Sequence, residues 1–102
     1  MGYAAEVVTY TITTDEQEFF LRRQAAILEI KRRHPELISV PFASKREDGS
    51  WFDVWICETP EAAQAANENT AELPEFLKFF AVLENVAIEI TDFPLSAANP
   101  LA

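Results

Sequence analysis

The residues best suited to chemistry form one alternating row: Trp51, Asp53, Trp55 and Cys57. Alternate side chains of a β-strand point to the same face, so this spacing would place two indoles, a carboxyl and a thiol side by side. Apolar walls around a few polar groups are typical of pockets for small ligands. Burial of Asp53 without a cation would make its carboxyl a candidate base.

The same row also has an ordinary interpretation. Tryptophan is common in protein cores, and Asp53 could pair with an arginine such as Arg23. Cys57 is the only cysteine, so it has no partner in the chain for a disulfide. Its position in an apolar strand predicts a buried, unreactive thiol.

Tyr10 and His34 are two further candidates. Tyr10 lies in a strand pattern and could supply a hydrogen-bonding hydroxyl to a pocket. His34 is the only histidine, and histidine exchanges protons near neutral pH. An alternative role for His34 is that of a cation at a helix C-terminus, since it follows Lys31, Arg32 and Arg33. The predicted catalytic residues are therefore Asp53, His34 and Tyr10.

Three phenylalanines have helical spacing near the end of the chain. Phe76, Phe79 and Phe80, with Leu83, follow the i, i+3, i+4, i+7 pattern of one helix face. This face could close a pocket or simply pack on a sheet. The predicted ligand-binding residues are Trp51, Trp55, Phe76, Phe79 and Phe80.

Composition argues against several classes of function. A net charge of −9 disfavours nucleic acid as a partner. A single histidine and a single cysteine cannot supply a structural zinc site, and no Gly-rich phosphate loop is present. No signal peptide and no run of about 18 apolar residues is apparent, so we expect a cytoplasmic protein that does not bind membranes. No metal and no cofactor is predicted.

The periodic segments alternate between strand and helix. In chain order they are a strand at 3–13, a helix capped by Thr14 and ending near His34, a strand at 38–46, an Asp-Gly turn, a strand at 51–58, a helix capped by Thr59, a short helix after Leu73-Pro74, and a strand at 85–93. In the first helix the predicted apolar stripe contains Phe20, Ile27 and Ile30, with Phe19 and Ala26 beside it.

This order, β-α-β-β-α-β, predicts an α+β, ferredoxin-like fold. Pro41 cannot donate a hydrogen bond to a neighbouring strand, so its strand should lie at an edge. The expected structure is one domain over 1–102, with an antiparallel sheet in the order 4-1-3-2 and a short tail at 94–102. Helices on one face would leave the other face bare and apolar, which predicts a homodimer.

Residues 5–93 resemble the dimeric α/β-barrel superfamily, and within it the antibiotic biosynthesis monooxygenase-like (ABM-like) group. The segments that carry the resemblance are Thr14–Glu16, Arg33–Glu36, Asp48–Val54 and Thr59–Ala63. It implies a homodimeric barrel with a cavity in each protomer between the sheet and its own helices. It also implies a cofactor-free monooxygenase for aromatic or polyphenolic molecules. The alternative is a non-catalytic ligand-binding or structural homodimer of the same fold.

Two details of the resemblance concern particular positions. Where related enzymes use an asparagine on the first strand, this chain offers Thr9, Tyr10 or Thr11. Haem-degrading relatives carry a ligating histidine in the second helical region, whereas residues 60–83 contain none.

Overall fold

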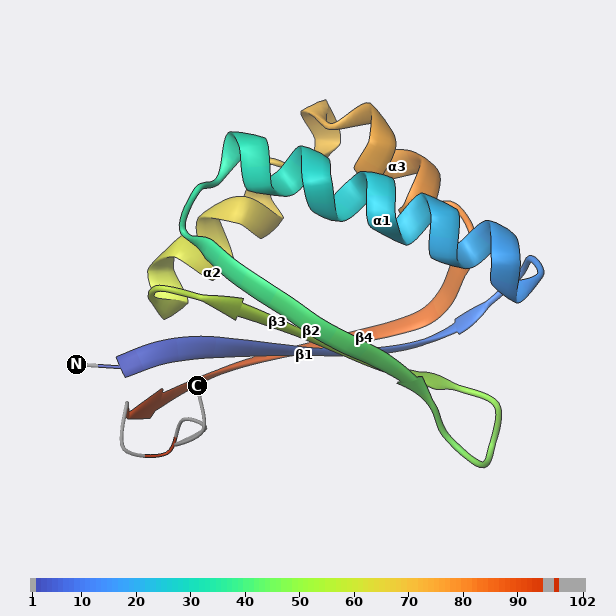
Figure 1. Ribbon diagram of the computed structural model, residues 1–102, viewed down its shortest axis with the longest axis horizontal. Coiled ribbons are helices and arrows are strands. Elements are labelled where there is room, and N and C mark those ends of the chain that lie inside the picture. Colours follow the sequence, from blue (N-terminus) through green and yellow to red (C-terminus); the bar gives the residue numbers. More distant parts are fainter. Residues whose placement is uncertain (1, 95–96, 98–102) are drawn as a thin grey trace.

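A four-stranded antiparallel sheet carries all the helices on one of its faces in the computed structural model, which describes residues 2–94 and 97 (Figure 1). The elements in chain order are β1 (Gly2–Ile12), α1 (Glu16–Arg33), β2 (Leu37–Lys45), β3 (Trp51–Cys57), α2 (Pro60–Glu68), the short 3-10 helix η1 (Thr70–Glu72), α3 (Pro74–Phe80) and β4 (Leu83–Pro94). The sheet order β2-β3-β1-β4 confirms the predicted ferredoxin-like arrangement.

The ends of the predicted segments differ from the structure by one or two residues. β4 continues to Pro94, which was expected to open the tail. The other predicted tail residues, except residue 97, lie outside the described part of the chain.

The first helix begins one residue later than predicted. Asp15, not Thr14, is its cap, because Asp15 Oδ1 accepts a hydrogen bond from the backbone N–H of Glu18 at 2.8 Å. Threonine and aspartate are both good N-cap residues, so the sequence alone does not show which of these two neighbours caps the helix. The predicted cap of α2 is confirmed: Thr59 Oγ1 accepts from Ala62 N–H at 3.0 Å.

The buried face of α1 is rotated from the predicted stripe. Phe19 and Ala26 are fully buried and Ile30 is nearly so, whereas Phe20 is 48% exposed. The Phe19 ring lies 4.9 Å from Trp51 and 5.8 Å from Tyr10, measured between ring centroids. Phe19 therefore joins α1 to the two central strands.

Irregularities shape both edge strands. Pro41 lies in β2, at the edge as predicted, and the register of β2 against β3 shifts between Ser39 and Phe42. On the other edge the β1–β4 register shifts next to Asn85, whose φ is 57°. Asparagine tolerates this left-handed conformation better than most residues. Figure 1 shows that β4 curves at this end from the sheet towards α3.

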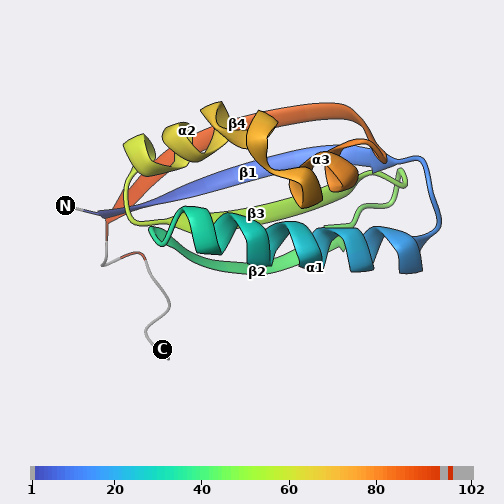
Figure 2. The same ribbon diagram turned by 90° about the horizontal axis from the view of Figure 1, so that it is seen from above.

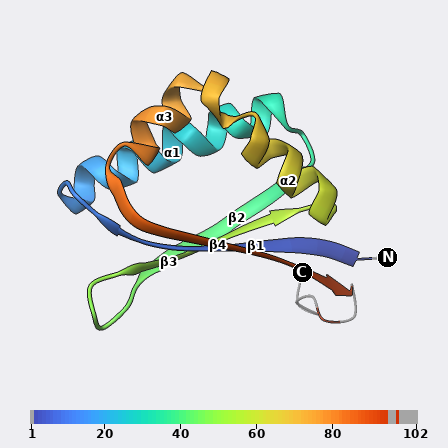
Figure 3. The ribbon, with the colours of Figure 1, turned by 180° about the vertical axis from the view of Figure 1, so that it is seen from behind.

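The helices divide the sheet between them. Seen from above, α1 runs beside β2 and β3, while α2 and α3 lie towards β1 and β4 (Figure 2). Seen from behind, the helices again all lie above the sheet, and no helix covers its lower face (Figure 3). Phe42, 47% exposed, stacks there on Phe52 with ring centroids 6.5 Å apart. No helix of the described residues has the length and apolarity needed to cross a bilayer.

The contrast between Phe19 and Phe20 gives a stability test. Truncating the buried ring in Phe19→Ala should cost about 3–5 kcal/mol, because it removes contacts to both central strands and leaves a cavity. Phe20→Ala on the same helix should cost about 1 kcal/mol, since half of its ring already meets water. Urea unfolding at one fixed protein concentration measures both, and equal losses would contradict this assignment of the buried face.

Candidate functional site

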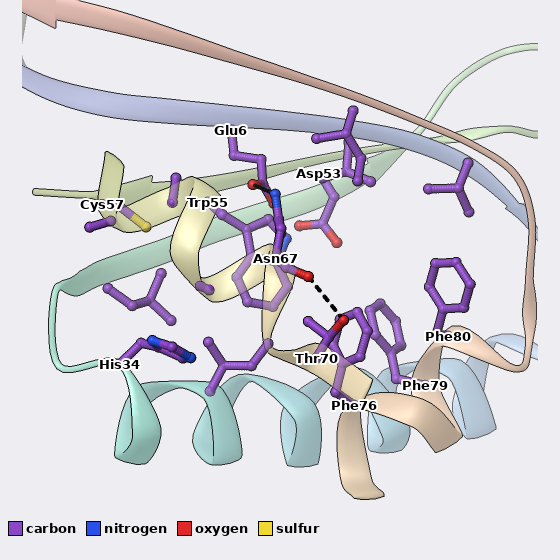
Figure 4. Close-up of a pocket in the computed structure, with 18 of the residues that line it drawn as sticks. Glu6, His34, Asp53, Trp55, Cys57, Asn67, Thr70, Phe76, Phe79 and Phe80 are labelled. Atoms are coloured by element: carbon purple, nitrogen blue, oxygen red, sulfur yellow. Dashed lines mark hydrogen bonds between the residues drawn. The ribbon is translucent and has the colours of Figure 1, made fainter. Parts of the chain in front are cut away.

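A cavity of about 60 Å³ lies between the sheet and its helices (Figure 4). Its sheet wall comes mainly from the two central strands, with Glu6, Val8 and Tyr10 on β1 and Asp53 and Trp55 on β3 among the lining residues, and the edge strands β2 and β4 contribute the rest. The register pairs Val8 with Asp53 and Glu6 with Trp55. Residues directly opposite in an antiparallel pair share a face, so all of these side chains point to the helices.

The helical wall of the cavity has small side chains on α2 and aromatic side chains on α3. Helix α2 contributes Ala62, Ala63 and Ala66, whose methyl groups leave room above the sheet. Helix α3 contributes Phe76, Phe79 and Phe80, which Figure 4 shows together at one side of the cavity. The three predicted phenylalanines therefore line the cavity, and their role in ligand binding stays a prediction.

Asp53 is held by a bidentate ion pair. Its side chain is almost completely buried, and its two oxygens accept hydrogen bonds from Arg23 Nε and Nη2 at 2.9 and 2.7 Å. The Tyr10 hydroxyl donates to the same carboxylate at 2.6 Å. The pairing of Asp53 with Arg23, the ordinary interpretation of the sequence, is confirmed.

The network around Asp53 also sets the protonation of Tyr10 and Arg23. Burial, followed by the charge and hydrogen bond of Asp53, raises the pKa of Tyr10 well above its ordinary value of 10. Burial alone would lower the pKa of Arg23, but the hydrogen bonds and charge of Asp53 outweigh it and raise that pKa. Tyr10 is therefore a neutral donor. The condition for Asp53 as a base, burial without a cation, is not met.

A second carboxyl in the cavity was missed by sequence reasoning. Glu6 is 8% exposed, and its Oε1 accepts a hydrogen bond from Asn67 Nδ2 at 2.7 Å. Burial raises the pKa of Glu6 above its ordinary value of 4.5, the charge of Asp53 adds to the rise, and the Asn67 hydrogen bond opposes it. The available signal was the alternation of β1, which places Glu6 on the same face as Val8 and Tyr10.

His34 also lines the cavity, from the helical side. It is the C-terminal cap residue of α1, and its backbone N–H donates to the Ile30 carbonyl at 2.7 Å. Its side chain is partly exposed. Position allows both interpretations made from the sequence, a cation at the helix end or a group that exchanges protons with a ligand.

The two tryptophans have different surroundings. Trp55 lines the cavity, but the structure corrects the prediction for Trp51. Trp51 lies against Phe19 and Phe20 of α1, with ring centroids 4.9 and 5.7 Å away. The helix fills the space in front of Trp51, so this indole packs in the core and does not reach the cavity.

The first strand contributes fewer polar groups than the resemblance offered. Of Thr9, Tyr10 and Thr11, only Tyr10 lines the cavity. Thr9 and Thr11 alternate with it and therefore point to the bare face of the sheet.

The thiol of Cys57 lies at the edge of the same cavity. Burial raises the pKa of Cys57 to about 11, with further contributions from the charges of Glu6 and Glu36. The thiol is therefore protonated at neutral pH, consistent with the predicted lack of reactivity. Among the described residues no group of three or more His, Cys, Asp or Glu side chains is placed to hold a metal ion.

The fold has well-defined relatives among solved structures. SnoaB, a cofactor-independent oxygenase from Streptomyces nogalater, superimposes with a TM-score of 0.69 at 16% identity over 98% of this chain and 99% of that chain. A proposed antibiotic biosynthesis monooxygenase from Caulobacter crescentus gives a TM-score of 0.69 at 16% identity over 90% of each chain. An uncharacterised NIPSNAP domain protein from Burkholderia xenovorans gives 0.62 at 19% identity over 94% and 98%.

No protein-family model matches the chain, and no curated protein matches its sequence. At identities below one fifth, the likeness to the solved structures concerns the fold. This chain therefore has the ferredoxin-like α+β fold found in ABM-like structures, as its sequence resemblance implied.

The buried ion pair gives a test of the site's architecture. Arg23→Met should destabilise the protein by about 3–5 kcal/mol, because it leaves the Asp53 carboxylate buried without its cation. Arg33→Met is the matched control on the same helix, since Arg33 pairs with Glu72 at the surface, and it should cost less than about 1 kcal/mol. Chemical denaturation compares the two, and similar losses would show that the Asp53 network is not a major source of stability.

Proposed function

We propose that this protein is a small cofactor-independent oxygenase that acts on an aromatic or polyphenolic small molecule. The observation that carries the proposal is the cavity itself. It is lined by Trp55 and the phenylalanines of α3, and it contains few polar groups, among them Glu6, His34 and the Tyr10–Asp53 pair. Its fold is that of SnoaB, which is a cofactor-independent oxygenase.

The chemistry needs little from the protein when the substrate is easily oxidised. Deprotonation makes such a molecule electron-rich enough to react with O₂ directly. A methylene group can then become a carbonyl, with one oxygen atom incorporated and the other released as water. The protein has to exclude solvent, orient the ring and accept a proton, and an apolar cavity with an ionisable lining group can do all three.

The same proposal includes a homodimer formed through the bare face of the sheet. That face carries Val7, Phe52, Val54 and Ile56, which are partly exposed, besides the more exposed Phe42. A contiguous apolar surface of this kind is typical of an interaction site. A second copy is the partner that the resemblance implies, because two such sheets can face one another.

The alternative is a non-catalytic ligand-binding or structural homodimer. The saturation of Asp53 by Arg23 and Tyr10 favours it, since that carboxylate has no free role as a base. Haem degradation is not proposed, because residues 60–83 contain no histidine. Turnover separates the oxygenase from the alternative.

Oxygen uptake with a panel of anthrones and quinols tests the oxygenase directly. We expect at least one compound to accelerate O₂ consumption above its rate without protein. Ala66→Phe should abolish this acceleration, because the new ring would fill the cavity. Ala65→Phe is the matched control on the exposed side of α2 and should leave uptake unchanged. Uptake that survives Ala66→Phe would place the reaction elsewhere, and absence of uptake with the whole panel would favour the non-catalytic alternative.

Sedimentation tests the dimer. The protein should sediment as a dimer at micromolar concentration, and Val54→Lys should shift it towards monomer by placing a charge in the centre of the bare face. Leu28→Lys adds the same charge to α1 at a residue that is 54% exposed, so it should leave the dimer intact. A wild-type protein that is monomeric at this concentration would refute the proposed assembly.

A further inference from the structure

The geometry points to Glu6 as the proton acceptor of the cavity, and to a compact aromatic compound with an acidic hydroxyl as its ligand. This inference rests on the proposed function, because it names the base and the substrate class of the same site. The hydroxyl would donate to Glu6 Oε2 while Asn67 holds Oε1.

Glu6 differs from the other buried carboxyls in what surrounds it. Asp53 has its cation. Among the described residues Glu29, like Glu6, has no ion pair, but its one hydrogen bond comes from the backbone N–H of Phe76 in the first turn of α3, at 2.9 Å, and it does not line the cavity. Within the described part of the chain, Glu6 has no ion pair, and its single hydrogen bond comes from the Asn67 side chain. Glu6 is therefore the buried carboxyl without a cation that faces the cavity, and burial of such a group is unfavourable for the fold alone, so a role towards a ligand accounts for it better.

The position of Glu6 suits a ligand in the cavity. It stands on the sheet opposite Trp55, and Figure 4 shows its carboxyl directed into the cavity towards Asn67. Asn67 lies in the last turn of α2, where its backbone carbonyl accepts from Thr70 Oγ1 at 3.1 Å. Asn67 is thus held in place and orients one oxygen of Glu6. The other oxygen is left for a donor that the protein does not supply.

The remaining titratable groups of the cavity are less suited to accept the proton. Tyr10 and Asp53 are engaged with one another, and Cys57 holds its own proton at neutral pH. His34 lines the cavity at the end of α1, on the side away from the sheet, and Glu36 lines it from the turn before β2 as an exposed residue. His34 is the real competitor, so it is included in the test.

The transfer is balanced in charge. The O–H bond of the ligand breaks, an O–H bond forms on Glu6 Oε2, and the negative charge moves from the carboxylate to the ligand oxygen. No additional charge is created in the apolar cavity, where a new charge would be costly. Burial favours the protonated form of Glu6, which brings its proton affinity closer to that of an acidic phenol or enol. The electron-rich anion is then the species that reacts with O₂ in the proposed function.

The apolar walls define the rest of the ligand. Trp55, Phe76 and Phe79 offer ring surfaces, which favour a planar aromatic body. Phe80 and Ile88 line the cavity yet are 45% and 52% exposed, so they form its mouth between α3 and β4. A larger ring system would extend outwards through this mouth while its hydroxyl reaches Glu6.

Titration with 4-nitrophenol tests the proton transfer without any need for turnover, because its absorbance distinguishes the ionised from the un-ionised form. Just below the pH at which the free phenol ionises, we expect the wild-type protein to bind it in the ionised form. A protonated-carboxyl band should appear at the same time in the infrared difference spectrum. Glu6→Gln, which retains an acceptor for Asn67, should bind the un-ionised phenol and show no such band.

Glu68→Gln is the matched control, since it removes the same charge from an exposed position next to Asn67. It should behave like the wild type. An identical bound spectrum in Glu6→Gln and wild type, or no saturable binding, would overturn the inference. So would loss of the ionised form in His34→Gln but not in Glu6→Gln. The infrared band of the wild type decides the matter if Glu6→Gln does not fold.

Oxygen uptake separates this inference from the proposed function. With a hydroxylated substrate that is turned over, Glu6→Gln should lower kcat by about 100-fold or more and change KM by less than about threefold. Wild-type uptake by Glu6→Gln would refute the role of Glu6 and leave the oxygenase standing. Glu6-dependent ionisation of 4-nitrophenol without uptake of O₂ by any substrate would refute the oxygenase and leave the proton acceptor standing.

Discussion

The ion pair between Arg23 and Asp53 is the constraint on which the rest of the structure depends. It joins the middle of α1 to the middle of β3 at a place where either charge alone would be strongly unfavourable. Tyr10 donates to the same carboxylate and brings β1 into the network. The rings of Phe19 and Phe79 pack edge-on and close to Tyr10, so the aromatic core is built around a fixed polar point.

This arrangement gives the two inward-facing carboxyls of the sheet different properties. Asp53 is fully paired and contributes to the architecture of the cavity. Glu6 lies two residues along β1 from the position opposite Asp53 and faces the same cavity. Its hydrogen-bond partner is the side-chain amide of Asn67. The paired Asp53 network is rigid and neutral overall, whereas Glu6 beside it has no cation. The cavity can therefore keep its shape while Glu6 changes its protonation.

Local patterns in the sequence were sufficient for the architecture. Pro41 predicted that β2 lies at an edge, and the bulky apolar residues on both faces of β3 predicted that this strand is central. The observed sheet order agrees with both predictions. The candidate site was only partly predictable. Trp51 and Trp55 share one strand face, and which of them meets the cavity depends on which helix residues lie above each. Glu6 was visible as a charge on an apolar strand face, but its partner Asn67 is 61 residues away in the chain.

The first strand serves two surfaces with alternate residues. Glu6, Val8 and Tyr10 look into the cavity, while Val7 and Thr9 look out from the uncovered side. Substitutions on one surface can therefore leave the other untouched, so ligand preference and association with other chains can diverge independently in evolution. Deletion or insertion of one residue within β1 would instead change both surfaces at once, since the cavity-facing and outward-facing side chains beyond that point would exchange faces.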